Sequence, residues 1–246
     1  KLQDPTEVIM LEAPAAVPDA SLLELYNPEL DQLNSDQLME LGFSIEESVK
    51  SADKRVVSIP YLGVSRARNE SLLLSSRGVS YKQDSNEVAA WCGPLLQDGD
   101  SRKSGIKILN RREWDPKAGK QIGEEAVEKA VELLNASPIQ SATMPVVLDE
   151  FTAPGFLSMF FRAFSAEAAQ RGLSRLKGKL GQKIAVPELT LMDEPHRTGG
   201  KRSCFMDSEG FLTKQLPLIE NGIFRNFLYH VESARKDNKT STGHAS

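Results

Sequence analysis

Apolar residues recur at helical spacing in two stretches of the first half of the chain. Between residues 35 and 53 they lie three or four positions apart, at Leu38, Leu41, Ile45, Val49 and Ala52. This periodicity predicts an amphipathic helix, and Ser35 stands where an N-cap is expected. A second pattern of the same kind covers residues 122–134 and predicts another helix. Glu125 and Lys129 form an i,i+4 pair on its polar side.

The segment between the two helices has the composition of a β-sheet. Residues 55–96 are rich in β-branched and aromatic side chains, and they predict antiparallel strands. Ser75 to Gly78 fits a turn between two of them, because glycine takes the positive φ that a tight reversal needs. Residues 97–105 are polar and predict a mobile loop. GIKIL at 105–109 predicts one more strand.

The second half of the chain alternates short apolar runs with loops. Asn221-Gly222 lies between two such runs, and this pair is the strongest short-range signal of a β-hairpin. A helical turn is expected at residues 231–237. The segments that predict strands are PVVL (145–148), ELTLM (188–192), FLTKQLPLI (211–219) and IFRNFLYH (223–230).

These patterns predict an α+β fold in more than one module. The first module is an antiparallel sheet with flanking helices, and the second mixes strands and helices and ends in a β-hairpin. We expect a linker or the remnant of a preceding domain at 1–34, a central α+β domain at 35–137 and the start of a C-terminal domain at 138–246. The chain begins with lysine and stops among small polar residues, so a fragment of a larger multidomain protein is expected.

Composition and charge exclude several classes of function. The 246 residues are 40% hydrophobic, which is enough for a sizeable core. The formal net charge of −4 provides no overall positive field that would attract nucleic acid. The sequence contains no run of 18 apolar residues, which a membrane-spanning helix would need. The two cysteines, Cys92 and Cys204, lie far apart, which favours reduced, buried thiols and a cytoplasmic protein.

The three histidines offer no local metal site. His196, His230 and His244 are too far apart for any two to share one helix turn. His230 is interpreted as a partly buried residue at a strand end, and the other two as solvated side chains of polar loops. The sequence also contains no GxSxG elbow that would present a serine nucleophile.

Two acidic loops and one basic loop carry the remaining candidate chemistry. Asp193-Glu194 and Asp207-Ser208-Glu209-Gly210 could divide acid and base roles or hold a hard cation, although loop carboxylates more often cap turns. The basic loop at 171–183 could contact an anion or an acidic peptide, but a solvated loop is the commoner reading. Its glycines match no phosphate-binding spacing.

Seven short segments of the second half occur in an order that resembles one known family. They are PVVL, PGFL, SRLKGKLGQKI, LTLMDEP, FMDSEGF, LIENGIFRNFL and the terminal STGH. In this order the chain is similar to the TldD/PmbA family of metalloprotease subunits, once called putative modulators of DNA gyrase. The resemblance reaches back through SADKRV at 51–56 and so covers nearly the whole chain.

The resemblance assigns a specific meaning to the segment after Pro154-Gly155. In the TldD type of subunit, a helix at this place carries HExxxH, which binds zinc and supplies a general base. In this sequence the three functional positions fall on Met159, Phe160 and Phe164. A thioether and two phenyl rings can neither hold zinc in this way nor act as a base. One turn apart on the expected helix, Phe160 and Phe164 are predicted to share a face and to fill the space of the metal site.

The resemblance therefore implies a PmbA-type subunit without zinc of its own. Zinc is expected only in a TldD-like partner, with which such a subunit forms a cytoplasmic protease for unfolded peptides around an enclosed dimer cavity. Asp193, Asp207, Glu209 and Gly210 are expected to serve architecture or peptide contact. Two alternatives stay open: a homodimeric peptide-binding scaffold, and a hydrolase whose metal is held by Asp193, Asp207, Glu209 and His196.

Overall fold

The computed structural model describes residues 16–245 and has the predicted α+β character. The chain divides into two compact units. In the described range, the central unit contains residues 25–70 and 84–143, and the terminal unit contains residues 16–24, 71–83 and 144–245. No helix in the described range is long and apolar enough to cross a membrane.

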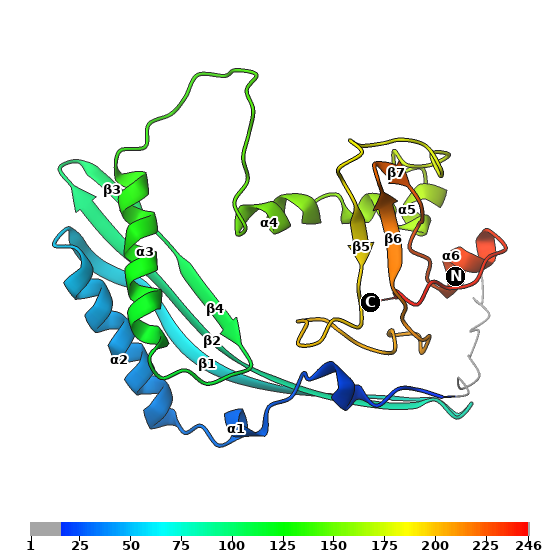
Figure 1. Cartoon of the computed structure of the whole chain (residues 1–246), viewed down its shortest axis with the longest axis horizontal. Helices are drawn as coiled ribbons and strands as arrows, with labels where there is room; N and C mark the ends of the chain where they lie inside the picture. Colours follow the sequence, from blue (N-terminus) through cyan, green and yellow to red (C-terminus); the bar gives the residue numbers. More distant parts are fainter. Residues whose placement is uncertain (1–15, 246) are drawn as a thin grey trace, which may run out of the picture. The chain divides into compact units, whose positions relative to one another are not determined.

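A four-stranded sheet forms the framework of the central unit (Figure 1). Its strands are β1 (Val56–Leu74), β2 (Ser80–Asp98), β3 (Ser101–Ser104) and β4 (Lys107–Arg111). β2 pairs with β1 and antiparallel with both β3 and β4, in registers that place Leu95 opposite Ser104 and Val88 opposite Arg111. β1 is therefore an edge strand of this sheet. Residues 71–83, at the turn between β1 and β2, belong to the terminal unit.

The turns of this sheet show one confirmed prediction and one that is wrong. The turn at Ser75–Gly78 is present: Gly78 has a φ of 89°, and the Ser75 amide donates to the Val79 carbonyl. The loop predicted at 97–105 is instead a tight hairpin, in which Gly99 takes a φ of 55° and β3 pairs back onto β2. The long, regular edge of β2 offers backbone partners that override the polar composition of Ser101–Ser104.

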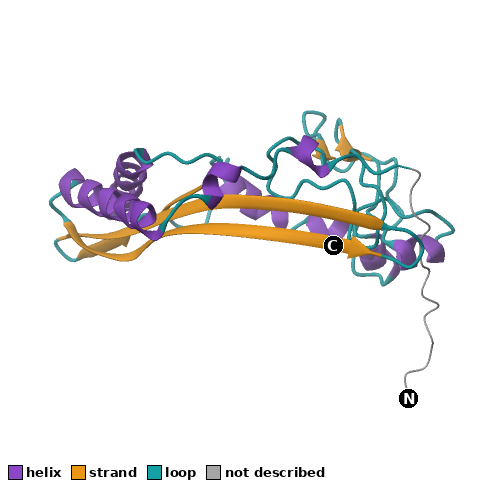
Figure 2. Cartoon of the chain, turned by 90° about the horizontal axis from the view of Figure 1, so that it is seen from below, coloured by secondary structure: helices purple, strands orange, loops and turns teal. Residues whose placement is uncertain are grey.

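Helices α2 (Ser35–Ala52) and α3 (Ala118–Leu134) cover one face of this sheet (Figures 1 and 2). Both were predicted from their apolar periodicity. Their apolar stripes meet the sheet in a core that contains Leu41, Ile45, Val49, Cys92, Leu96, Ile122, Ala126 and Ala130. Glycine permits the close approach of the helices, because a Cβ on Gly119 would lie 2.4 Å from Ser44 Oγ and one on Gly123 would lie 2.7 Å from Ser48.

Side chains on the polar side of α3 interact both with the sheet and with one another along the helix. Glu125 accepts a hydrogen bond from Gln121 and pairs with Lys107 of β4. These two partners, with a smaller contribution from the charge of Lys129, lower the pKa of Glu125. The strongest partner of Glu125 therefore comes from β4 and not from the i,i+4 position.

The cap of α2 lies one residue earlier than predicted. Asn34, not Ser35, is the N-cap: its side chain accepts from the Gln37 amide at 2.9 Å, and the Gln37 side chain accepts from the Asn34 amide at 3.0 Å. This reciprocal capping box satisfies two amides that the helix leaves free. Ser35 is the first helical residue instead.

Asn34→Ala is expected to destabilise the protein by about 1 kcal/mol, because one of these bonds disappears and the other loses its geometry. Ser35→Ala is the matched control and should change the free energy of unfolding by less than about 0.5 kcal/mol. Urea unfolding followed by circular dichroism measures both values. Equal effects of the two substitutions would contradict the assigned cap.

The predicted linker at 1–34 is described only from residue 16 onward, so residues 1–15 lie outside the described part. A 3₁₀ helix, η1 (Ala20–Leu23), and a short helix, α1 (Pro28–Asp31), follow. In the central unit Leu30 and Leu33 are buried against Val88. These leucines give residues 28–33 a fixed place in the central unit.

The terminal unit contains a small sheet with short helices around it. Its strands are β5 (Leu191–Asp193), β6 (Leu216–Glu220) and β7 (Ile223–Phe224), in the order β5-β6-β7. The hairpin predicted at Asn221-Gly222 is confirmed, with φ angles of 50° and 77° and with Glu220 opposite Ile223. The helices are α4 (Thr152–Ser158), η2 (Phe161–Phe164), α5 (Ala166–Gln170) and α6 (Val231–Lys236), the last at the predicted helical turn.

The strand predicted at 145–148 is absent. Residues 136–149 have no regular secondary structure, and Val147 is 95% exposed. A β-strand needs a neighbour for its backbone groups, and within the described residues no strand pairs with this segment. The apolar, β-branched composition alone therefore does not produce a strand here.

Candidate functional site

The segment that the resemblance aligns with a zinc helix is not one continuous helix. α4 ends at Ser158, Met159 is its C-cap, and a 3₁₀ turn covers Phe161–Phe164. The prediction that Phe160 and Phe164 share one face of an α-helix is therefore wrong. Backbone hydrogen bonds fix the chain directly after the 3₁₀ turn: Leu228 donates to the Phe164 carbonyl at 2.8 Å, and Ala166 donates to the Leu228 carbonyl at 2.9 Å. This bridge holds Ser165 in an extended conformation and ends the helical course.

The three aligned side chains occupy different environments. Phe164 is 5% exposed and packs against Phe224, with ring centroids 6.0 Å apart, in a cluster with Leu216, Leu218 and Ile219. Met159 is 67% exposed and Phe160 is 50% exposed. Phe160 makes an edge contact with Phe156, at 5.3 Å between centroids. Phe164 is thus a core residue of the terminal unit, whereas the other two lie at its surface.

The donor chemistry at these positions does not fit zinc. Zinc in proteins is held by thiolate, imidazole or carboxylate groups, and none of the three side chains offers one. Across the described residues 16–245, no group of three or more His, Cys, Asp or Glu side chains is arranged to hold a metal ion. The described part of the chain therefore supplies neither the ligands nor the base of the HExxxH pattern.

Asp207 organises the acidic loop as a hub of backbone contacts. The residue is 5% exposed, and its carboxylate accepts from the amides of Glu209 and Phe211 through Oδ1 and from that of Ala245 through Oδ2. Gly210 closes this turn with a φ of 88°. Asp207 therefore joins its own turn to the segment that ends the described chain.

Glu209 links the same loop to α6. Its Oε2 accepts from the amide of Val231, the first residue of that helix, at 2.8 Å. A carboxylate at this end of a helix satisfies a free amide and interacts favourably with the positive end of the helix dipole. The contacts of Asp207 and Glu209 in the structure are with the backbone of the same unit.

Asp193 and His244 come together although they are far apart in sequence. The His244 Nε2 atom lies 3.8 Å from Asp193 Oδ1. The imidazole is only 6% exposed, and neither ring nitrogen has a hydrogen-bond partner among the described residues. The prediction that His244 is solvated is wrong, because Thr242 and Ala245 on either side of it are fixed by hydrogen bonds to Tyr229 and Asp207. Both residues lie in segments that carry the family resemblance, LTLMDEP and STGH, but neither periodicity nor spacing predicts that they meet.

His196 takes a different position from the one that a metal site would require. Its Nε2 lies 2.8 Å from Thr213 Oγ1, and its ring packs against Phe205 at 4.9 Å. Asp193, Asp207, Glu209 and His196 are all described, and they are not gathered into a metal-binding group. The alternative of a carboxylate-based hydrolase thus has no assembled site in this part of the chain.

The remaining candidate residues are one histidine and the two cysteines. His230 is partly exposed beside Glu167, with 3.7 Å between Nε2 and Oε2. Cys92 and Cys204 are both free thiols. Burial raises the pKa of Cys92 to about 11, and burial together with the charges of Asp207 and Asp193 raises the pKa of Cys204. Neither thiol is thus prepared to act as a nucleophile at neutral pH.

The basic loop at 171–183 is a series of turns. Gly172, Gly178 and Gly181 all have positive φ angles of 74° to 78°. The Gly181 amide donates to the Phe224 carbonyl at 2.8 Å, and Arg171 pairs with Glu167. Glycine is favoured at such positions because a Cβ would be strained there. The loop geometry gives no anion-binding cradle of the kind formed at the start of a long helix.

Two family models match the chain in succession. Residues 28–134 match the PmbA/TldA metallopeptidase central domain, and residues 141–246 match the PmbA/TldA metallopeptidase C-terminal domain. Together the two models account for most of the chain.

Individual relatives agree with this assignment. The Metalloprotease PmbA homolog of Haemophilus influenzae is 26% identical over 92% of this chain and 50% of the relative. The Metalloprotease PmbA of Escherichia coli O157:H7 is 25% identical over 94% and 53%. A metalloprotease of Methanothermobacter thermautotrophicus is 32% identical over 72% and 40%. The chain thus spans about half the length of the curated relatives it matches.

Solved structures give the same picture. A putative modulator of DNA gyrase from Thermotoga maritima matches with a TM-score of 0.86 and 26% identity, over 96% of this chain and 54% of that one. TldE from Thermococcus kodakarensis matches with a TM-score of 0.78 and 25% identity, over 98% and 53%. From the two domain models and these relatives, the chain belongs to the PmbA/TldD metallopeptidase family.

Proposed function

We propose that this chain is part of a metal-free, PmbA-type subunit that acts with a zinc-bearing, TldD-like partner in the cleavage of unfolded peptides. The observation that carries the proposal is the set of side chains at Met159, Phe160 and Phe164, where the catalytic type of subunit has HExxxH. The similarity to a solved structure named TldE agrees with this proposal.

Hydrolysis of a peptide bond needs an activated nucleophile and a group that accepts its proton. A metal-bound water becomes a nucleophile near neutral pH because the metal lowers its pKa, and a carboxylate base helps to remove its proton. A thioether and phenyl rings do neither, and Phe164 is occupied in the core of the terminal unit. In this account the partner supplies the zinc chemistry, and this subunit contributes surface that binds and confines the peptide in the cytoplasm.

The proposal is tested with the purified full-length protein and a fluorogenic peptide that has no stable structure. Alone and after treatment with a chelator, the protein should cleave at the background rate. Mixed with an HExxxH-bearing subunit from the same organism, it should raise cleavage at least about tenfold above that of either chain alone. The control is a partner whose HExxxH glutamate is replaced by glutamine, which should remove the activity of the mixture.

Cleavage by the metal-stripped protein alone at the rate of the mixture would contradict the proposal. Co-purification from the native cell separates it from a homodimeric peptide-binding scaffold. Recovery of an HExxxH-bearing chain agrees with the subunit role, and recovery of the homodimer alone in repeated preparations favours the scaffold.

A further inference from the structure

β1 and β2 form a long two-stranded ribbon that belongs to both compact units (Figure 1). Its residues 56–70 and 84–98 lie in the central unit, and its tip, residues 71–83, lies in the terminal unit. The whole ribbon falls within residues 28–134, which match the family's central domain. The terminal unit thus contains a segment that the family models assign to a different domain.

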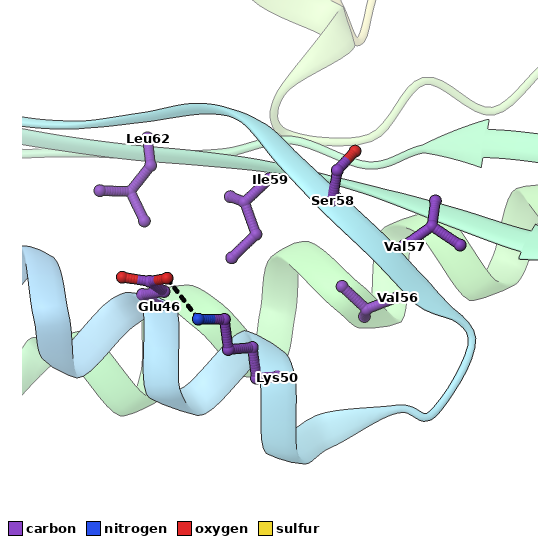
Figure 3. Close-up of a pocket in the computed structure, with 7 residues that line it drawn as sticks. All are labelled: Glu46, Lys50, Val56, Val57, Ser58, Ile59 and Leu62. Atoms are coloured by element: carbon purple, nitrogen blue, oxygen red, sulfur yellow. Dashed lines mark hydrogen bonds and ion pairs between the residues drawn. The ribbon is translucent and has the colours of Figure 1, made fainter.

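The part of the ribbon that begins β1 is held by apolar packing. Val56, Ile59 and Leu62 pack against the core that the sheet forms with α2 and α3. A pocket of about 370 Å³ remains between this part of β1 and α2, and two of its lining side chains, Glu46 and Lys50, pair with each other (Figure 3). The contacts here are those of helices that cover a sheet.

Buried positions change parity where β2 leaves the tip. Val79 and Tyr81 are 4% and 8% exposed, whereas further along β2 the buried residues have even numbers, at Asn86, Val88 and Ala90. Side chains of a strand alternate between its two faces, so a change of parity marks a change of packing environment. The first two residues belong to the terminal unit and the other three to the central unit.

Tyr81 and Gln83 bind the backbone of another segment of the terminal unit. The Tyr81 hydroxyl accepts from the Phe205 amide at 3.2 Å and donates to the Gln83 side chain. The side-chain amide of Gln83 donates to the Ser203 carbonyl at 3.1 Å. Because Ser203 and Phe205 are 4% and 8% exposed, these bonds stand in for water that the fold excludes.

The segment bound in this way leads directly into the acidic turn. The Phe205 carbonyl accepts from the Thr213 amide at 3.1 Å, and the Asp207 amide donates to the Phe211 carbonyl at 2.9 Å. Asp207 then holds the amides of its own turn and of Ala245. The acidic turn is therefore supported by its own backbone pairing and by the two side chains of the ribbon tip.

We propose that the ribbon tip is an intramolecular clamp, in which Tyr81 and Gln83 hold residues 203–205 and so keep the acidic turn of the terminal unit in place. The terminal unit thereby depends on a segment that lies within the family's central domain. This goes beyond the proposed subunit role, because it concerns neither zinc nor cleavage, and its failure would leave that role untouched.

Cys204 can report on the clamp because it lies between the two bound residues. Burial, with a smaller contribution from the charge of Cys204, raises the pKa of Tyr81, which agrees with a thiol close to the clamp. In the full-length protein, labelling of Cys204 by N-ethylmaleimide is measured by mass spectrometry of its peptides. Tyr81→Phe should make this labelling about fivefold faster, because the Phe205 amide loses its acceptor and the clamp opens more often.

Tyr61→Phe is the matched control, because it removes the same hydroxyl from a 65% exposed ring of the same ribbon. It should leave the labelling rate of Cys204 unchanged. Equal rates in the Tyr81→Phe and Tyr61→Phe proteins would overturn the proposal. Equal acceleration at Cys92, which is fully buried in the core of the central unit, would also overturn it, since general unfolding would then replace local opening.

Hydrogen exchange on the unaltered protein gives a second test that needs no variant. The Phe205 amide should exchange at least about a hundred times more slowly than in the unfolded chain, because it is bonded to Tyr81 in a buried position. An unprotected Phe205 amide would overturn the proposal.

Discussion

Replacing Phe164 by alanine is expected to lower the free energy of unfolding of the terminal unit by about 3–5 kcal/mol. The ring is 5% exposed, contacts Phe224 and lies among leucine and isoleucine side chains of the small sheet. Its removal loses the apolar burial and leaves a cavity that the backbone bridge to Leu228 prevents from closing. Phe164 is thus expected to be a structural residue, although it stands at the second histidine position of the zinc pattern.

Phe160→Ala is the matched control because it removes the same ring from the neighbouring aligned position. Phe160 is 50% exposed, so its loss should cost less than about 1.5 kcal/mol. Denaturant unfolding of both variants, followed by a probe of the terminal unit such as amide hydrogen exchange at β6, measures the difference. Equal destabilisation by the two substitutions would show that the two rings do not occupy the environments described.

Gly105→Ala is expected to destabilise the central unit by about 3 kcal/mol, at the upper end of overpacking effects. A Cβ at this position would lie 2.3 Å from the Ala126 carbonyl oxygen and 2.5 Å from the Ala130 nitrogen. Both atoms belong to the backbone of α3, so relief requires the whole helix to move away from the sheet. The core between α3 and β2 would lose packing with it.

Gly155→Ala serves as the control for this substitution. Gly155 lies in α4, and an added Cβ would meet nothing within 4 Å. Alanine has the higher helix propensity, so the protein should be unchanged or up to about 1 kcal/mol more stable. Urea midpoints of the two variants make the comparison. A Gly105→Ala protein as stable as the unaltered one would contradict the close approach of α3 to residue 105.

The parts of the fold that could be predicted from the sequence are those that local chemistry determines. The apolar stripe at 35–53 and the one at 122–134 gave α2 and α3, because a helix buries one face at fixed spacing. Asn221-Gly222 gave the hairpin, because both residues accept positive φ angles. In each case the preference of a few neighbouring residues agrees with the tertiary structure.

The predictions that failed depend on partners distant in sequence. PVVL at 145–148 has strand composition, but no described strand pairs with it. Residues 101–104 are polar, yet the edge of β2 makes them a strand. The helical course that follows Pro154-Gly155 ends at Phe164, where Leu228, more than sixty residues later, bonds to the backbone on both sides of Ser165. Periodicity within a short window contains none of these contacts.

In the candidate site, too, some features follow from the local sequence and others depend on residues far apart in the chain. The residue types at 159, 160 and 164 could be read directly, and the chemistry they exclude follows from those types alone. The burial of Phe164, the hub formed by Asp207 and the approach of His244 to Asp193 could not be predicted, since each arises when segments far apart in sequence fold together.

The most direct test of the central claim is the metal content of the full-length protein, purified without chelator and measured by mass spectrometry after dialysis against zinc and then against metal-free buffer. The account predicts that retained zinc stays far below one ion per chain and does not change in a Met159→Ala, Phe160→Ala double variant. One retained zinc per chain that this double variant removes would contradict it.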